Sequence, residues 1–133
     1  MSKIISLSEA ASIAIHGIIL IARSKKPLNV VQISEMTGTS RHHTAKVMQR
    51  LVKEGYINSL RGPSGGFSLN KSPEKISFLN VYETIEGIIN IPSCPMDKQI
   101  CPFDKCIMNN LLNRMTEEFR DYMGTQFISD YLK

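Results

Sequence analysis

Cysteine is scarce in this 133-residue chain: the only three, Cys94, Cys101 and Cys106, fall within thirteen consecutive positions. An odd number of cysteines cannot be fully paired within one chain, so a disulfide framework explains the set poorly. The segment CPMDKQICPFDKC holds no C-x-x-C redox pair, and the sequence shows no paired nucleophile and base. These absences argue against an enzyme with a small-molecule substrate. They leave a metal, a cluster or a redox signal as roles for the three sulfur atoms.

Long apolar runs are also missing. The longest, residues 10–22, is interrupted by His16 and followed by Arg23, whereas a membrane-spanning helix needs about 20 apolar residues. No small-residue cleavage site of a signal peptide follows it. We therefore expect a cytoplasmic protein with no membrane partner. In that reducing compartment, clustered cysteines favour metal or redox chemistry over structural disulfides.

Acidic residues are scarce in the first half of the chain. Residues 1–71 hold ten Lys and Arg against three acidic residues, a net charge of +7, and residues 72–133 hold six against nine, a net charge of −3. This asymmetry predicts that the first half meets a polyanion and that the second half has another role. The length suits one domain with an extension, and we place the boundary between residues 1–75 and 76–133.

The first helical signal runs from Ser6 to Arg23, where Ser6 or Ser8 can cap the first turn. Residues 30–37 form a second, shorter helical signal that ends at Gly38. Its apolar residues Val30, Ile33 and, less strictly, Met36 lie on one side of this short helix.

A third helical signal follows directly. Thr39 or Ser40 caps it, and it continues to about Glu54, with Gly55 as its stop. Its predicted buried stripe consists of Ala45, Val47, Met48, Leu51 and Val52. A short helix, a tight turn with glycine and a second helix with a basic polar face form a helix-turn-helix.

Two short strand signals come next, at residues 56–60 and 66–69, on either side of the Gly/Pro loop 61–65. A hairpin directly after a helix-turn-helix is the wing of a winged helix. The predicted fold class is therefore mainly α with a small β-hairpin: a winged helix-turn-helix followed by a long C-terminal dimerisation helix.

Double-stranded DNA is the partner that this arrangement favours. The major groove admits one helix, whose side chains reach base edges and phosphates, and a wing can enter the neighbouring minor groove. The alternative is that the winged helix is a protein-interaction module. The predicted DNA contacts are Thr39, Ser40, Arg41, His42, His43, Lys46, Gln49 and Arg50 of the third helix, and Arg61, Gly62, Pro63, Ser64 and Gly65 of the wing.

The second half begins with a predicted helix from Ser77 to Gly87, followed by the cysteine segment and a long helix from about Phe103 to Met123. Apolar residues recur along this last helix at helical spacing: Ile107, Leu111, Met115, Phe119 and Tyr122. A second copy of the chain is the expected cover for this stripe, and a homodimer would bind a palindromic operator. The alternative is that the helix packs back onto its own domain.

The order of these elements resembles the Rrf-two family of bacterial winged-helix transcription regulators. The resemblance rests on the segment LVKEGYINSLRGPSGGFSL, on the pair Glu86-Gly87 and on the three cysteines that follow, and it covers essentially the whole chain. The family includes regulators of iron–sulfur cluster assembly, nitric-oxide-sensing repressors and regulators of cysteine metabolism. It implies a dimeric, DNA-binding transcription regulator.

In cluster-binding members of the family, three cysteines hold a 2Fe–2S or 4Fe–4S cluster, which implies that Cys94, Cys101 and Cys106 are ligands here. Thiolates are the usual ligands of such clusters. The sequence departs from the family's more usual spacing of about five residues per gap, because its gaps are six and four residues.

A cluster needs a fourth ligand. Some relatives use a histidine three residues after the last cysteine, a position occupied here by Asn109. Others use an acid in the first helix of the partner subunit, and that position corresponds to Ser12. Glu9, Ser12 and His16 lie on one helical stripe. The position of His16 resembles one that serves as a ligand in a rarer relative, so the resemblance implies His16 as the first candidate for the fourth ligand and Glu9 as the second.

Two alternatives keep DNA binding and change the role of the cysteines. In the first, the cysteines form a metal-free thiol switch that responds to oxidants. In the second, three thiolates and one imidazole hold Zn²⁺ in tetrahedral coordination.

Overall fold

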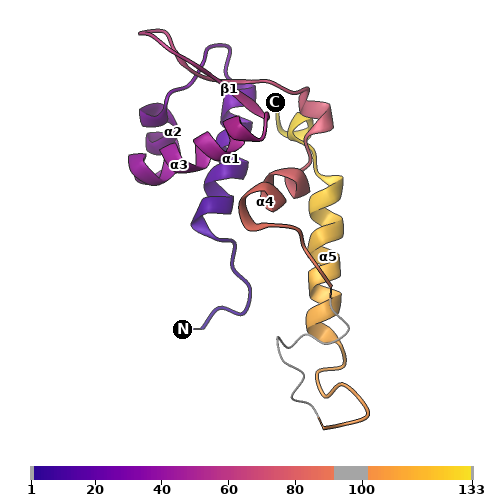
Figure 1. The fold of residues 1–133 in the computed structure, drawn as a ribbon. Coiled ribbons are helices and arrows are strands. Elements are labelled where there is room, and N and C mark those ends of the chain that lie inside the picture. Colours follow the sequence, from indigo (N-terminus) through magenta and orange to yellow (C-terminus); the bar gives the residue numbers. More distant parts are fainter. Residues whose placement is uncertain (1, 92–101, 133) are drawn as a thin grey trace.

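The computed structural model describes residues 2–91 and 102–132. The helices are α1 (Glu9–Arg23), α2 (Val30–Thr37), α3 (Arg41–Lys53), α4 (Phe78–Glu86) and α5 (Leu111–Thr125). Strands β1 (Ile57–Leu60) and β2 (Gly66–Leu69) form an antiparallel hairpin, and the short 3-10 helices η1 (Pro73–Lys75) and η2 (Ile128–Tyr131) complete the order. The mainly α fold with one small hairpin is confirmed (Figure 1).

Polar side chains begin the helices where the sequence predicts. Ser8, rather than Ser6, caps α1, because its Oγ accepts the backbone N–H of Ala11 at 3.1 Å. Ser40 caps α3 by accepting the N–H of His43 at 3.1 Å. Each bond satisfies one of the N–H groups that a helix start leaves without an intrahelical partner.

The core lies where α1 crosses α3. Ile13, Ile18, Met48 and Leu51 are all buried there. Gly17 permits the close approach, because a Cβ at that position would lie 2.8 Å from Cε of Met48. The predicted buried stripe of α3 is confirmed at its centre, at Val47, Met48 and Leu51. Helix α1 packs against this buried side and so positions the recognition helix.

The apolar side of α2 is only partly buried. Ile33 is buried, but Met36 is 60% exposed, and Ser34 is buried instead. The Ser34 hydroxyl donates to the Val31 carbonyl at 2.9 Å, so this polar group is satisfied inside the fold. A helix this short turns too few residues inward for its apolar spacing to fix the buried side.

The wing sheet gains a third member from the segment before α2. Leu28 and Phe67 exchange backbone hydrogen bonds of 3.1 and 2.7 Å across an isolated bridge. Gly66, at φ +143°, is needed there because a Cβ would come within 2.6 Å of the Leu28 backbone. The wing is thus anchored to the start of the helix-turn-helix.

Helix α4 packs against α1 and α3, and α5 packs against α4 on the outer side (Figure 1). Two aromatic pairs hold this second layer together: Tyr82 meets Phe119 edge to face, and Phe78 stacks on Tyr131, each with centroids 5.2 Å apart. No helix in residues 2–91 or 102–132 is long and apolar enough to cross a membrane.

The long C-terminal helix begins later than predicted. We expected it from about Phe103, but α5 starts at Leu111, and residues 102–110 form bends and turns. Asn109 and Asn110 both adopt left-handed backbone angles, with φ of 52° and 55°. Asparagine tolerates this region better than other non-glycine residues, so the pair interrupts a run whose apolar spacing looked continuous. Ile107 therefore lies outside the helix and is 74% exposed.

Candidate functional site

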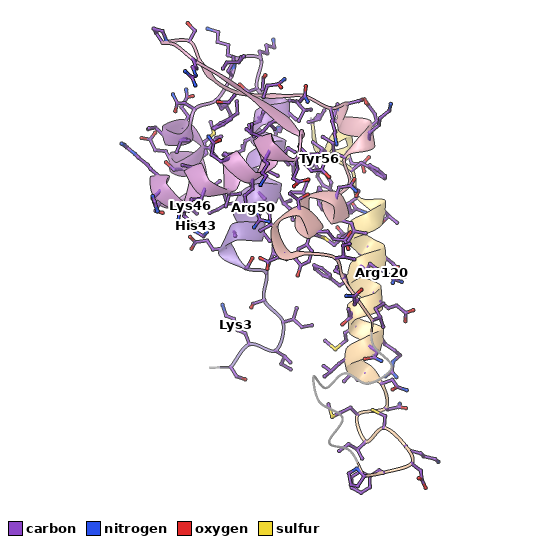
Figure 2. The ribbon with its side chains drawn as sticks, viewed as in Figure 1. Lys3, His43, Lys46, Arg50, Tyr56 and Arg120 are labelled. Atoms are coloured by element: carbon purple, nitrogen blue, oxygen red, sulfur yellow. The ribbon has the colours of Figure 1, made fainter. Side chains whose placement is uncertain are left out.

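The recognition helix α3 presents polar side chains on the side opposite the core. Arg41, His42, Lys46 and Gln49 are exposed, and their side chains make no hydrogen bond or ion pair within the described part of the chain. Figure 2 shows His43, Lys46 and Arg50 following one another along this helix. The arrangement leaves cationic and amide groups available for base edges and phosphates.

A chain of hydroxyl groups fixes the turn before α3. The Thr39 hydroxyl lies 2.7 Å from that of Thr37 and 2.9 Å from that of Thr44, which is fully buried. Thr39 is a predicted DNA contact, and the structure gives it a role in setting the angle between α2 and α3.

His43 and Glu9 are brought together although 34 positions separate them in the sequence. The Nδ1–H of His43 donates to Oε1 of Glu9 at 2.7 Å. One residue is a predicted DNA contact and the other a predicted metal ligand, so the start of α1 is bonded to the start of the recognition helix. The sequence offers no signal for this pair.

Arg50, another predicted DNA contact, is bonded to the end of α4. Its Nη2 donates to the Thr84 carbonyl at 2.7 Å, and its Nη1 donates to the Ile85 carbonyl at 3.2 Å. Both carbonyls belong to the last turn of α4. Figure 2 shows Arg50 where α3 and α4 approach each other, and the guanidinium thus bonds to protein within the same chain.

The wing forms a tight, exposed loop. Gly62 has φ of +98°, and its carbonyl accepts the N–H of Gly65 at 2.9 Å. Arg61, Pro63 and Ser64 are exposed around this turn. The loop presents the cation Arg61 at its base, where its exposed side chain is available for a phosphate.

Of the three cysteines, Cys106 is described and half-buried, whereas Cys94 and Cys101 lie outside the described residues. The backbone N–H of Asn110 points to Sγ of Cys106 at 3.4 Å. A hydrogen bond of this kind fixes the direction of the sulfur atom. Cys106 lies just before α5, in a segment that Figure 1 places far from α1.

Glu9, Ser12 and His16 lie on one side of α1, as their spacing predicts, and all three line one hollow of about 310 Å³. His16 is exposed, and its Nδ1–H donates to the Ser12 carbonyl at 2.7 Å. A neutral imidazole bonded in this way keeps its lone pair on Nε2, the atom that can bind a metal. In residues 2–91 and 102–132 no three His, Cys, Asp or Glu side chains come together as a metal site.

The segment that leads from α4 towards the cysteines is held in place. The Glu83 carboxylate accepts the N–H of Ile89 at 2.8 Å, and the Glu83 carbonyl accepts the N–H of Gly87 at 2.9 Å. The hydroxyl of Ser8, the cap of α1, donates to the Glu86 carboxylate. These contacts join the last turn of α4 to the segment that follows it and to the start of α1.

An apolar groove of about 840 Å³ runs between the N-terminal segment, α1, α4 and α5. We call it the α5 groove. Its walls include Ile4, Ile19, Tyr82, Met115 and Tyr122. Burial, and then the nearby charge of Glu86, raises the pKa of the Tyr82 phenol.

A family model described as Rrf2, an iron-dependent transcriptional regulator, matches residues 7–133 of the chain. The chain belongs to the Rrf2 family. The resemblance drawn from the wing and the cysteines is confirmed, and this Rrf2 protein is a transcriptional regulator of the DNA-binding kind.

Relatives of this Rrf2 chain include the HTH-type transcriptional regulator NsrR of Bacillus subtilis, 30% identical over 107 residues, or 79% of this chain and 73% of the relative. The HTH-type transcriptional regulator IscR of Xenorhabdus nematophila is 24% identical over 107 residues, or 80% of this chain. The match spans 65% of the length of that IscR, just under two thirds.

Solved structures show the same fold. CymR, the global cysteine regulator of B. subtilis, superposes with a TM-score of 0.76 at 19% identity and covers 97% of both chains. T. potens IscR gives a TM-score of 0.74 at 17% identity, over 96% of this chain and 86% of that one. At these identities the likeness shows the Rrf2 fold alone.

Proposed function

We propose that this protein is a homodimeric transcription regulator whose affinity for a palindromic operator is controlled by an iron–sulfur cluster on Cys94, Cys101 and Cys106. The observation that carries the proposal is the pairing, in one Rrf2 chain, of an exposed basic recognition helix with three cysteines between α4 and α5. The description of the family as iron-dependent supports an iron group over zinc.

The DNA-binding part of the proposal assigns base contacts to the exposed start of α3. Recognition helices of this type read base edges with their N-terminal residues. Arg41, His42 and Lys46 occupy that end, and Gln49 follows one turn later. Arg61 in the wing would contact the neighbouring minor groove or its phosphates.

The described residues fit an iron–sulfur cluster by donor chemistry. Cys106 offers a sulfur directed by the Asn110 N–H, and His16 offers Nε2 because its Nδ1 is occupied by the Ser12 carbonyl. When bound, a cluster supplies a group that responds to oxidants, nitric oxide or iron supply. Glu9 ranks behind His16 as the fourth ligand, because His43 already holds the Glu9 carboxylate. The segment 102–110, which contains Cys106, lies apart from α1 within one chain (Figure 1), so the His16 that completes the set would come from the partner subunit.

A second copy of the chain is the proposed occupant of the α5 groove. Met115, Phe119 and Tyr122 of the predicted stripe line this groove, together with the N-terminal segment. An isologous pair buries the same apolar surface twice and places two α3 helices for two half-sites.

The cluster is tested by anaerobic purification, visible spectroscopy and analysis of iron, sulfide and zinc. We expect brown protein with iron and sulfide in similar amounts. Colourless protein without sulfide, even after reconstitution, would overturn the cluster. Zinc in its place would support the tetrahedral alternative.

DNA binding is tested with a duplex of about 30 bp selected by the protein from a random-sequence pool. Binding should weaken as salt increases, and Arg61→Ala should reduce the salt slope by about 1 if Arg61 meets a phosphate. Lys75→Ala, which removes an exposed cation from η1, is the matched control. An unchanged slope in Arg61→Ala would show that the wing assignment is wrong.

The second candidate function is a metal-free thiol switch. The three clustered cysteines support it as the alternative, because thiolates can be oxidised reversibly without any metal. In that case Cys101→Ser would abolish an oxidant response of DNA binding in metal-free protein. A response that requires iron would exclude it.

A further inference from the structure

The end of the recognition helix is bonded to the end of α4. The Arg50 guanidinium donates to the carbonyls of Thr84 and Ile85 at 2.7 and 3.2 Å. The last carbonyls of a helix have no intrahelical partner and carry partial negative charge. A guanidinium can bond two adjacent acceptors at once because its donors are fixed in one plane.

The same turn of α4 holds the segment that leads to the cysteines. Glu83 accepts the Ile89 N–H through its carboxylate and the Gly87 N–H through its carbonyl. Residues 83–89 therefore form one hydrogen-bonded unit, with Arg50 on one side and the entrance to the cysteine segment on the other. A displacement of this entrance would act directly on the carbonyls that Arg50 holds.

A role for Arg50 as a DNA contact fits this geometry poorly. It lies in the last turn of α3, whereas base contacts come from the first turns of a recognition helix. To reach a phosphate, its guanidinium would also have to release both carbonyls. Lys46, one turn earlier on the same helix, is exposed and has no such bonds within the described residues.

We propose that Arg50 is a positioning residue that couples residues 83–89 to the recognition helix within one subunit, and that it does not contact DNA. The inference rests on the proposed function to the extent that the cysteines are the sensor. This coupling runs from the cysteine segment through α4 to α3 of the same subunit. It does not pass through α5 or the partner subunit.

The first test separates coupling from phosphate contact by salt dependence. Arg50→Met should leave the salt slope of binding to the selected duplex unchanged, whereas Lys46→Met should lower it by about 1. Arg50→Lys keeps the charge but cannot bond both carbonyls in the same geometry, so it should behave like Arg50→Met. A reduced slope in Arg50→Met that Arg50→Lys restores would overturn the proposal.

The second test is a double-mutant cycle on metal-free, reduced protein. Glu83→Ala removes the acceptor of the Ile89 N–H, and we expect it to change the Kd for the selected duplex by about threefold or more. The change should largely disappear in the Arg50→Met background and persist in the Lys46→Met background. Equal changes in all three backgrounds, or none in the wild type, would overturn the coupling. Far-UV circular dichroism and thermal unfolding confirm that each variant is folded.

Measurements on protein loaded with iron and sulfide distinguish this inference from the proposed function. If the cluster controls binding, the ratio of Kd values for loaded and metal-free protein should approach 1 in Arg50→Met and keep its wild-type value in Lys46→Met. A wild-type ratio of 1 would contradict the proposed function, and the cycle on metal-free protein would still decide the role of Arg50.

Discussion

The core between α1 and α3 and the helix α5 differ in how completely their apolar side chains are buried. In the winged helix-turn-helix, Ile13, Met48 and Leu51 are at most 1% exposed, and α1 packs against α2, α3 and β2. Along α5, Met123 is the one buried side chain of the helix, and Tyr122 is 54% exposed. The difference teaches that the crossing of α1 and α3 is a complete core, whereas α5 presents an apolar surface that the described residues cover only in part.

The largest expected effect concerns the core of the first half. Met48→Ala should lower the free energy of unfolding by about 2–5 kcal/mol, because it removes a fully buried side chain and leaves a cavity beside Gly17. The matched control is Met36→Ala, at a methionine that is 60% exposed, which should change stability by less than about 0.5 kcal/mol. Urea unfolding followed by circular dichroism measures both. Similar losses in the two variants would contradict the contrast in burial.

The next effect concerns the exposed apolar surface of α5. Tyr122→Glu places a charge in the α5 groove, so it should dissociate the proposed homodimer. Loss of the second DNA-binding domain should then weaken operator binding by about a hundredfold. Sedimentation velocity and DNA titration measure the two changes.

Glu118→Gln, on the exposed part of α5, is the control and should remain dimeric. A Tyr122→Glu variant with the mass and affinity of the wild type would show that the α5 groove is not the interface.

Local chemistry made most of the fold predictable. Ser40 and Ser77 cap their helices, and Gly38, Gly55 and Gly87 end theirs at positive φ. Each of these signals acts within a few residues, so no tertiary information is needed to place them. The start of α5 could not be placed in this way, because apolar spacing continued through Asn109 and Asn110 while their backbone turned left-handed.

The parts of the site that could not be predicted are contacts between distant positions. His43 bonds to Glu9 and Arg50 bonds to Thr84, each across 34 positions. Both side chains were predicted to contact DNA because they lie on the polar face of the recognition helix. The sequence shows that a helix face is basic, but it does not show which cations are already bonded to protein. That distinction depends on how α1 and α4 pack against α3.

The smallest expected effect concerns the tyrosine of the α5 groove. Burial, with a smaller contribution from the Glu86 charge, raises the pKa of Tyr82, so folding favours the neutral phenol. This contribution to stability is fully present below the ordinary tyrosine pKa of about 10, and it is lost as the pH rises towards the raised value. The free energy of unfolding of the wild type should therefore fall above about pH 10, and it should fall less in Tyr82→Phe. Tyr56→Phe, at the base of the wing, is the matched control. Identical pH profiles for the wild type and Tyr82→Phe would show that the groove does not disfavour the ionised phenolate of Tyr82. The contrast between the α1–α3 core and the groove beside α5 would then be weaker.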